Sequence, residues 1–252
     1  MGSGVSLVLV TGAARRLGAD LARRFAADGH RVALHAHGSL EDARRICAEI
    51  AAKGGEAALF PGDFSKPGGA AAMFDALVAA MGVPDIVVNN ASVFAYDSPG
   101  AADEAMLRAS LEVHTLAPLA IIERAAKLRP TAQKLAVFNI LDQRLMNMNP
   151  DFHSYTIGKA ALRAAGEAWR AAGRADVRVF GIMPGLLLPS GAQSQERYEA
   201  DTLKSPLRRG VSTRDIYEAI AFFAGNANLP GQDFAVDCGE SLTARGRDVA
   251  FE

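Results

Sequence analysis

The stretch "TGAARRLG" (11–18) directly follows the apolar run "VSLVLV" (5–10) and decides how the rest of the chain is interpreted. A glycine turn that leads from a first strand into a helix is typical of nucleotide-binding folds. Gly12 suits the tight turn, and Gly18 suits close packing of the helix on the strand. The position between them, where a further glycine is expected, is Arg16. The G-x-G-x-x-G spacing is therefore absent, and the signal depends on its context.

The rest of the chain supplies that context, because apolar strand-like runs alternate with alanine-rich helical segments. Short, almost continuously apolar strands between helices predict a parallel sheet that is covered on both faces. We expect a single-domain, doubly wound α/β fold of the Rossmann type over residues 1–252, with a loop or lid at about 185–210. The predicted strands are 5–10, 31–37, 56–60, 85–90, 134–141, 176–183 and 233–237, and the predicted helices are 15–28, 40–53, 68–81, 102–129, 154–173 and 212–224.

Composition and charge exclude several classes of function. The 252 residues are 50% hydrophobic and carry a net charge of -1, so no nucleic-acid partner is expected. No apolar run approaches the length of a membrane-spanning helix, so no membrane partner is expected either. The two distant cysteines, Cys47 and Cys238, form no disulfide framework and favour a reducing cytoplasm.

The end of the second predicted strand indicates which dinucleotide the turn holds. An acidic residue there would bind the ribose hydroxyls of NAD and repel a 2′-phosphate, but "LHAHGS" places Ala36 at this position. Arg15, His37 and Ser39 are expected to gather there instead, which favours NADP(H). His35 and His37 also resemble half of a metal site, yet no third ligand stands at a suitable spacing, so no metal is predicted.

A second motif, "SYTIGKAAL", places Tyr155 and Lys159 four residues apart on one helix face. The Lys159 ammonium is expected to favour the phenolate and so to lower the pKa of Tyr155. Such a tyrosine can give a proton to the atom that gains electrons as hydride reaches the substrate. The spacing alone is moderately specific, and its place after a fifth predicted strand strengthens the prediction.

Together, "TGAARRLG", "NNAS", "YTIGK", "MPG" and "GQDFAVDCGESL" occur in the order and spacing of the short-chain dehydrogenase/reductase family, which the chain resembles over nearly its whole length. The resemblance implies a nicotinamide cofactor that shares one domain with the substrate, and a homodimer or homotetramer. It also implies a structural role for Asn90, an adenine contact for Asp63 and a hold on the nicotinamide ribose for Lys159. The cofactor-binding residues it implies are Gly12, Arg15, Arg16, Leu17, Gly18, His37, Ser39, Asp63, Phe64, Asn90, Ala91, Lys159, Pro184 and Gly185.

Three departures from the general family pattern resemble its pteridine reductase and dihydromonapterin reductase branch. Asp142 stands where the family has its catalytic serine, His114 replaces a helix asparagine, and Arg16 replaces the middle glycine. The resemblance implies that Arg16 faces the active site and that Phe94 stacks a pterin against the nicotinamide. The implied catalytic residues are Asp142, Tyr155 and Lys159, and the implied substrate-binding residues are Arg16, Ser92, Phe94 and Tyr155.

The sequence thus predicts an NADPH-dependent pterin reductase, with two alternatives. A general short-chain carbonyl or 3-oxoacyl reductase is disfavoured because an ionised Asp142 is a poor donor to a carbonyl oxygen. A non-catalytic dinucleotide sensor is disfavoured because it needs no proton donor such as Tyr155. Structural explanations also stay open for three residues: core packing for Phe94, a buried helix histidine for His114, and a turn or cap residue for Asp142.

Overall fold

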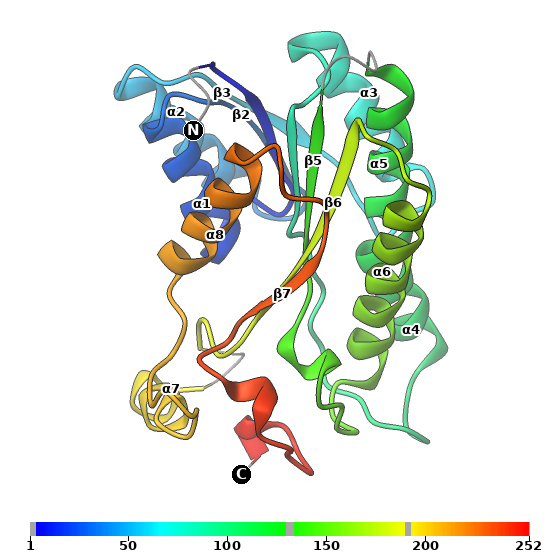
Figure 1. The fold of residues 1–252 in the computed structure, drawn as a ribbon, viewed down its shortest axis with the longest axis vertical. Helices are drawn as coiled ribbons and strands as arrows, with labels where there is room; N and C mark the ends of the chain where they lie inside the picture. The colour runs from blue at the N-terminus through cyan, green and yellow to red at the C-terminus, as the bar shows by residue number, and fades with distance from the viewer. Residues whose placement is uncertain (1–3, 130–133, 190–192, 252) are drawn as a thin grey trace.

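The computed structural model describes residues 4–129, 134–189 and 193–251. They form a seven-stranded sheet in the order β3-β2-β1-β4-β5-β6-β7, with all neighbouring strands parallel (Figure 1). The predicted doubly wound α/β fold is confirmed. The strands are β1 (Leu7–Val10), β2 (Arg31–Ala36), β3 (Ala57–Pro61), β4 (Ile86–Asn89), β5 (Leu135–Ile140), β6 (Val177–Pro184) and β7 (Asp233–Val236).

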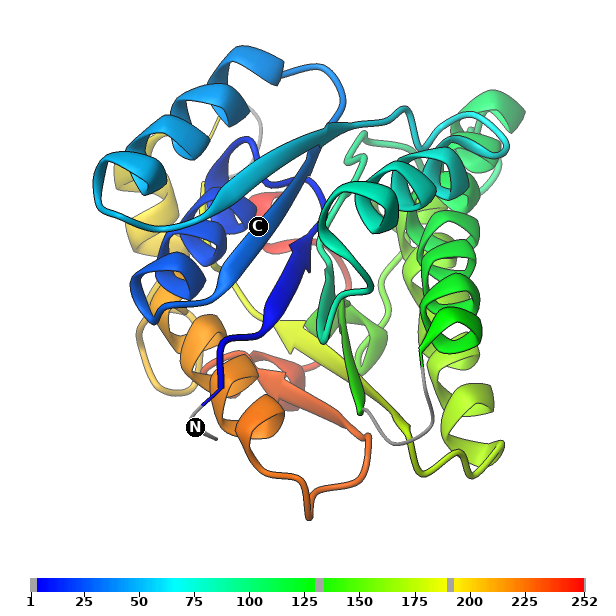
Figure 2. The same cartoon turned by 90° about the horizontal axis from the view of Figure 1, so that it is seen from above.

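Helices cover both faces of the sheet, as Figure 2 shows from above. On one of the two faces, a π-helical turn, η1, lies between the α-helices α4 and α5. One face carries α1 (Arg16–Ala27), α2 (Leu40–Ala52) and α8 (Thr213–Gly225), and the other carries α3 (Gly69–Met81), α4 (Glu104–Leu111), η1 (Glu112–Leu116), α5 (Ala117–Leu128) and α6 (His153–Ala171).

The strands are mostly apolar because successive side chains enter two different core layers. Val8 and Val10 of β1 pack in one layer with Phe25 of α1. Leu9, between them, packs in the other layer with Phe74 of α3. Since side chains alternate along a strand, burial of both faces favours apolar residues at successive positions.

The predicted helix 102–129 contains the wider turn η1, in which the Ala117 N–H bonds to the carbonyl of Glu112. Pro118 follows and has no N–H to continue an α-helical ladder, which accounts for the wider turn. End to end, Glu104–Leu128 is long and apolar enough to cross a membrane, so the expectation that no such run exists is wrong. Its α4 part packs on α6 and its α5 part on α3, as expected for a core helix.

The predicted loop 185–210 contains a short helix, α7 (Gln195–Thr202), so the loop assignment is wrong there. Ser194 begins the helix, because its hydroxyl accepts a hydrogen bond from the Arg197 N–H. Residues 190–192 of this segment lie outside the described residues. Three 3₁₀ turns lie near the carboxyl ends of the strands: η2 (Gln143–Leu145), η3 (Glu240–Leu242) and η4 (Val249–Phe251).

Candidate active site

A cavity of about 540 Å³ opens where the carboxyl ends of β1, β4, β5 and β6 meet. The strand order reverses between β1 and β4, and such a switch point is where open α/β sheets bind ligands. Most of the predicted site residues meet in this one cavity. They are Gly12, Arg15, Arg16, Leu17, Gly18, Asn90, Ser92, Phe94, Asp142, Tyr155, Lys159, Pro184 and Gly185.

The turn after β1 is folded too tightly for side chains at its two glycines. Gly12 has a φ of +64°, and a Cβ there would lie 2.9 Å from Ala91 Cα. A Cβ on Gly18 would lie 2.3 Å from the Gly12 carbonyl oxygen. The Asn90 amide locks the turn to the end of β4 by donating to the Thr11 and Gly12 carbonyls at 2.8 and 3.1 Å. This arrangement keeps the start of α1 open to a ligand.

Arg16 adopts a left-handed backbone conformation, with a φ of 54°, which explains why glycine is expected at this position. An L-residue in this conformation costs roughly 1 kcal/mol relative to glycine. The Arg16 side chain is exposed, lines the cavity, and has no hydrogen bond or ion pair to another described residue. Strain of this kind at a cavity indicates a functional role for the side chain.

The region expected to receive a 2′-phosphate contains a carboxylate that the sequence analysis did not consider. Arg15 Nε lies 2.5 Å from Asp42 Oδ2, in the first turn of α2. Arg45 approaches the same carboxylate at 3.3 Å. A second cavity of about 310 Å³ is lined by these three residues and shares Arg15 and Arg16 with the first.

Five residues predicted to bind cofactor do not line the main cavity. The Phe64 ring is buried and stacks on His35, with ring centroids 3.7 Å apart. His37 Nε2 lies 3.9 Å from Asp63 Oδ2, beyond the end of β2. No group of three or more histidine, cysteine, aspartate or glutamate side chains that could hold a metal occurs among the described residues. The five are His37, Ser39, Asp63, Phe64 and Ala91.

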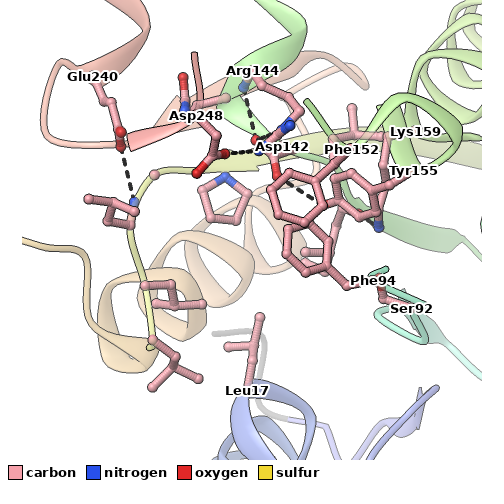
Figure 3. Close-up of a pocket in the computed structure, with 18 of the residues that line it drawn as sticks. Leu17, Ser92, Phe94, Asp142, Arg144, Phe152, Tyr155, Lys159, Glu240 and Asp248 are labelled. Atoms are coloured by element: carbon pink, nitrogen blue, oxygen red, sulfur yellow. Dashed lines mark hydrogen bonds and ion pairs between the residues drawn. The ribbon is translucent and has the colours of Figure 1, made fainter. Parts of the chain in front are cut away.

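The predicted catalytic residues lie together in the wall of the cavity, and a hydrogen bond joins two of them, Tyr155 and Asp142 (Figure 3). The Tyr155 hydroxyl donates to Asp142 Oδ2 at 2.9 Å. Lys159, one helical turn further along α6, is buried and donates from Nζ to the Ile140 carbonyl at 2.6 Å. Asp142 Oδ1 also accepts from the Arg144 N–H at 2.9 Å, so Asp142 caps η2 as well as contacting Tyr155.

The electrostatics of this group differ from the expectation. Burial and the Asp142 carboxylate raise the pKa of Tyr155 well above its usual value of 10, so the expected lowering is wrong here. The prediction counted the Lys159 ammonium and neglected a carboxylate at hydrogen-bond distance. Burial lowers the pKa of Lys159 to about 8, against the opposing pull of Asp142. At neutral pH Tyr155 is therefore protonated and Lys159 is mostly charged.

Arg144 is a central residue of the site that the sequence analysis missed. It is 5% exposed, and its Nε lies 3.5 Å from Asp142 Oδ1. It also pairs with Asp248 and donates to the Asp151 carbonyl at 2.9 Å. Its guanidinium lies over the Phe152 ring, 5.2 Å from the centroid. Arg144 thus joins the catalytic carboxylate to the C-terminal segment.

The C-terminal segment, residues 243–251, folds back against the cavity. Arg247 donates to both oxygens of Asp151, at 3.0 and 2.8 Å, and the Asp248 N–H donates to one of them at 2.7 Å. The Phe251 ring packs edge-on against Tyr96, with centroids 5.1 Å apart. The mixed charged and apolar stretch "RGRDVAF" is the sequence signal that could have drawn attention to this segment.

Phe94 is not a core residue, since 44% of it is exposed at the cavity. One face of its ring stacks on Phe152, with centroids 4.1 Å apart, and the Tyr155 ring lies perpendicular to it, with centroids 4.8 Å apart. Phe152, which the sequence analysis also missed, holds this ring in place from a left-handed backbone conformation with a φ of 55°. A flat ligand beside Tyr155 would therefore meet a fixed aromatic surface.

His114 is fully buried behind Ser92 and is bonded to it, which agrees with the alternative of a satisfied helix histidine. Burial lowers the pKa of His114 to about 2, so the ring is neutral. Ser92 itself reaches the cavity. The histidine therefore acts on a ligand only through the serine.

Comparisons with known proteins span the whole domain. A protein-family model described as enoyl-(acyl carrier protein) reductase matches residues 12–241. The FolM alternative dihydrofolate reductase 1 of Brucella canis, whose structure was solved with NADP, is 34% identical, with a TM-score of 0.91 over 96% of each chain. Pteridine reductase 1 of Leishmania tarentolae is 29% identical over 94% of this chain and 96% of its own. The 3-oxoacyl-[acyl-carrier-protein] reductase FabG of Staphylococcus aureus is 26% identical over 92% of this chain and 96% of its own.

Proposed function

Because the chain belongs to the short-chain dehydrogenase/reductase family, we propose that it is an NADPH-dependent reductase that converts a dihydropterin to the tetrahydro level. The observation that carries the proposal is the hydrogen bond from Tyr155 to Asp142 beside the exposed face of Phe94. A polar heteroaromatic ring is the ligand that suits a carboxylate, a phenol and an aromatic surface together.

The turn after β1 fits a dinucleotide cofactor. A Cβ at Gly12 or Gly18 would collide with the backbone of Ala91 or Gly12, so these glycines allow the tight turn, and no described side chain caps the start of α1. The free N–H groups of that helix end favour an anion. We assign the 2′-phosphate to Arg15 and Arg45, whose shared partner Asp42 holds them beside the cavity. When bound, NADPH supplies the hydride.

Residues in the wall of the cavity supply the proton and stabilise the negative charge that its transfer leaves on Tyr155. Tyr155 keeps its proton at neutral pH because burial and Asp142 raise its pKa, and it gives this proton to the nitrogen of the substrate C=N bond. Asp142 holds the single hydroxyl hydrogen of Tyr155 in the free protein, and the hydroxyl turns from Asp142 to the substrate as it gives the proton. The Lys159 ammonium, 5.7 Å from the centroid of the Tyr155 ring, stabilises the phenolate that remains.

Three side chains that do not take part in proton transfer favour a pterin as the substrate. Phe94 offers one ring face, since Phe152 covers the other. Arg16 offers planar donors without a competing partner among the described residues. Ser92 offers a hydroxyl at the same cavity. A ring with several nitrogen and oxygen atoms can use all three.

A general carbonyl or 3-oxoacyl reductase is the second candidate, favoured by the likeness to FabG. Asp142 argues against a carbonyl reductase, because it accepts a hydrogen bond from Tyr155 and offers no hydroxyl group that could donate to a carbonyl oxygen. The buried Tyr155 and Lys159 argue against a non-catalytic sensor, because burying such groups is costly without a use for them.

The test is steady-state oxidation of NADPH with a panel of dihydropterins, β-ketoesters and diketones. We expect turnover of a dihydropterin and competitive inhibition by diaminopteridine antifolates, which copy its ring. If dihydropterins are inert, the antifolates do not bind the NADPH complex and a β-ketoester is reduced, the general carbonyl reductase replaces our proposal. If NADPH binds and no substrate is reduced, the sensor replaces it.

A further inference from the structure

A chain of hydrogen bonds leads from the cavity into the protein behind Ser92. The buried His114 ring places Nε2 at 2.9 Å from Ser92 Oγ and Nδ1 at 3.0 Å from Ser110 Oγ. Ser110 in turn donates to the backbone carbonyl of Ser154 at 2.7 Å. We refer to Ser92, His114, Ser110 and the Ser154 carbonyl as the relay.

The Ser154 carbonyl, at the buried end of the relay, determines which group donates and which accepts in the hydrogen bonds that follow it. A carbonyl oxygen can only accept, so the single hydroxyl hydrogen of Ser110 points to Ser154. Ser110 Oγ must then accept from His114, which places the ring hydrogen on Nδ1. In a neutral imidazole the other nitrogen, Nε2, then carries a lone pair.

The outer end of the relay gives the same direction independently. The Val93 backbone N–H can only donate, and it donates to His114 Nε2 at 3.2 Å. Nε2 is therefore an acceptor. The one lone pair of Nε2 is shared by the Val93 N–H and the Ser92 hydroxyl, and if the Ser92 hydrogen pointed elsewhere, an oxygen lone pair would face this nitrogen across 2.9 Å. Ser92 must donate to His114, which leaves only oxygen lone pairs for the cavity.

The neighbouring helix leaves room for the relay at one glycine. A Cβ on Gly158, the glycine of "YTIGK", would lie 2.7 Å from Ser110 Oγ and 2.9 Å from His114 Nδ1. The Thr115 hydroxyl donates to the Gly158 carbonyl at 3.0 Å and holds η1 against α6. The close approach of Ser110 and His114 to Gly158 explains why a glycine stands at this position, to which the sequence analysis gave no role.

We propose that His114 is a positioning residue that fixes Ser92 as a hydrogen-bond acceptor, so that the site selects substrates with an N–H donor at this point. The inference rests on the proposed function for its substrate class. A pterin ring carries N–H and amino donors, and a simple ketone carries none. The carbonyl oxygen of a ketone at this point would face the lone pairs of Ser92 Oγ with its own lone pairs, and no hydrogen bond could form.

The first test measures the tautomer of His114 directly and does not depend on any substrate. Nitrogen NMR of histidine-labelled protein, with His114 assigned by its loss in His114→Phe, reports which ring nitrogen carries the hydrogen. We expect the Nδ1–H form throughout the neutral range. An Nε2–H form, or a ring that becomes cationic near neutral pH, overturns the proposal.

The second test measures the selection itself, by calorimetric binding to the NADP⁺ complex. The ligands are a dihydropterin and a series of its analogues, each methylated at one N–H position. In the wild type, one analogue should bind roughly tenfold more weakly than the parent, as expected for one lost hydrogen bond to a desolvated acceptor. In Ser92→Ala that analogue and the parent should bind alike. Equal penalties in both proteins overturn the proposal.

The His114→Phe variant separates positioning from simple packing. It removes the acceptor for the Ser92 hydrogen, so the hydroxyl can rotate and the penalty for the methylated analogue should disappear while NADPH affinity is unchanged. An undiminished penalty in a folded variant overturns the proposal. If no pteridine binds the wild type, the proposed function fails, and the tautomer measurement still decides the direction of the relay.

Discussion

At the scale of single residues, Arg16 stands in a backbone conformation that favours glycine. Arg16 and Arg208 have almost the same left-handed φ, 54° and 52°, and Cys238 has 54°. Of the two arginines, only Arg16 lines the main cavity.

Replacing each arginine by glycine separates strain from function. Arg16→Gly should raise the free energy of unfolding by about 1 kcal/mol, because the left-handed conformation costs glycine little. It should also weaken dihydropterin binding, since a donor in the cavity is lost. Arg208→Gly should give a similar stabilisation with unchanged kinetics. Urea unfolding and KM measurements check both, and an Arg16→Gly enzyme with full substrate affinity would refute the role of this arginine.

Tyr155 carries the chemical step in the proposed mechanism. Tyr155→Phe should lower kcat by at least ~100-fold, as removal of a general acid typically does, with NADPH binding retained. Tyr217→Phe is the control, because its hydroxyl bonds to Asp28 outside the cavity. The measurement is kcat together with the Kd for NADPH. A fully active Tyr155→Phe enzyme would mean that the proton comes from another group.

At the scale of elements, the C-terminal segment closes one side of the substrate cavity. Arg247, Asp248 and Val249 line the cavity, and Asp151 anchors the segment through its contacts with Arg247 and Asp248. Because the cavity wall depends on this anchor, substrate affinity should depend on residues that never touch the reacting atoms.

Arg247→Ala tests the anchor. The Arg247 side chain is half exposed, so solvent screens its ion pair, which should contribute only modestly to holding the segment. We expect faster hydrogen exchange over residues 245–251 and a several-fold higher KM for the substrate, with the Kd for NADPH unchanged. Arg214→Ala, which breaks an exposed pair with Glu218 on α8, should change neither. Unaltered exchange in Arg247→Ala would show that the apolar contacts alone hold the segment.

The sequence predicted the features that depend on local pattern. Apolar strands, glycine turns and the Tyr155–Lys159 spacing are properties of short segments, and the sheet and most of the cavity lining follow from them. Arg144 and Asp248 could not be predicted in this way, because they are 104 residues apart and only the fold brings them together. The pKa of Tyr155 was predicted in the wrong direction because burial and a carboxylate from another element control it.

At the scale of the whole molecule, the fold carries charged and titratable groups that reduce its stability. Lys159 is the clearest case, since burial lowers its pKa from 10.5 to about 8. The unfolded chain keeps this proton up to about pH 10.5, whereas the folded chain loses it near pH 8. Below pH 8 the buried ammonium therefore destabilises the fold, and this cost disappears as the pH rises through that interval. A shift of this size corresponds to about 3 kcal/mol.

Lys159→Met removes the ammonium while keeping a long unbranched side chain, and it should abolish turnover. Near pH 7 we expect the variant to be more stable than the wild type by about 2 kcal/mol, because the lost hydrogen bond to the Ile140 carbonyl offsets about 1 kcal/mol of the gain. The advantage should fall through zero as the pH rises from about 8 to about 10.5, where the wild type keeps the hydrogen bond and becomes more stable than the variant by about 1 kcal/mol. Urea unfolding without cofactor across this interval measures it, with Lys53→Met as the control for an exposed lysine. A stability difference that stays constant from pH 7 to 10.5 would mean that the Lys159 ammonium does not destabilise the fold.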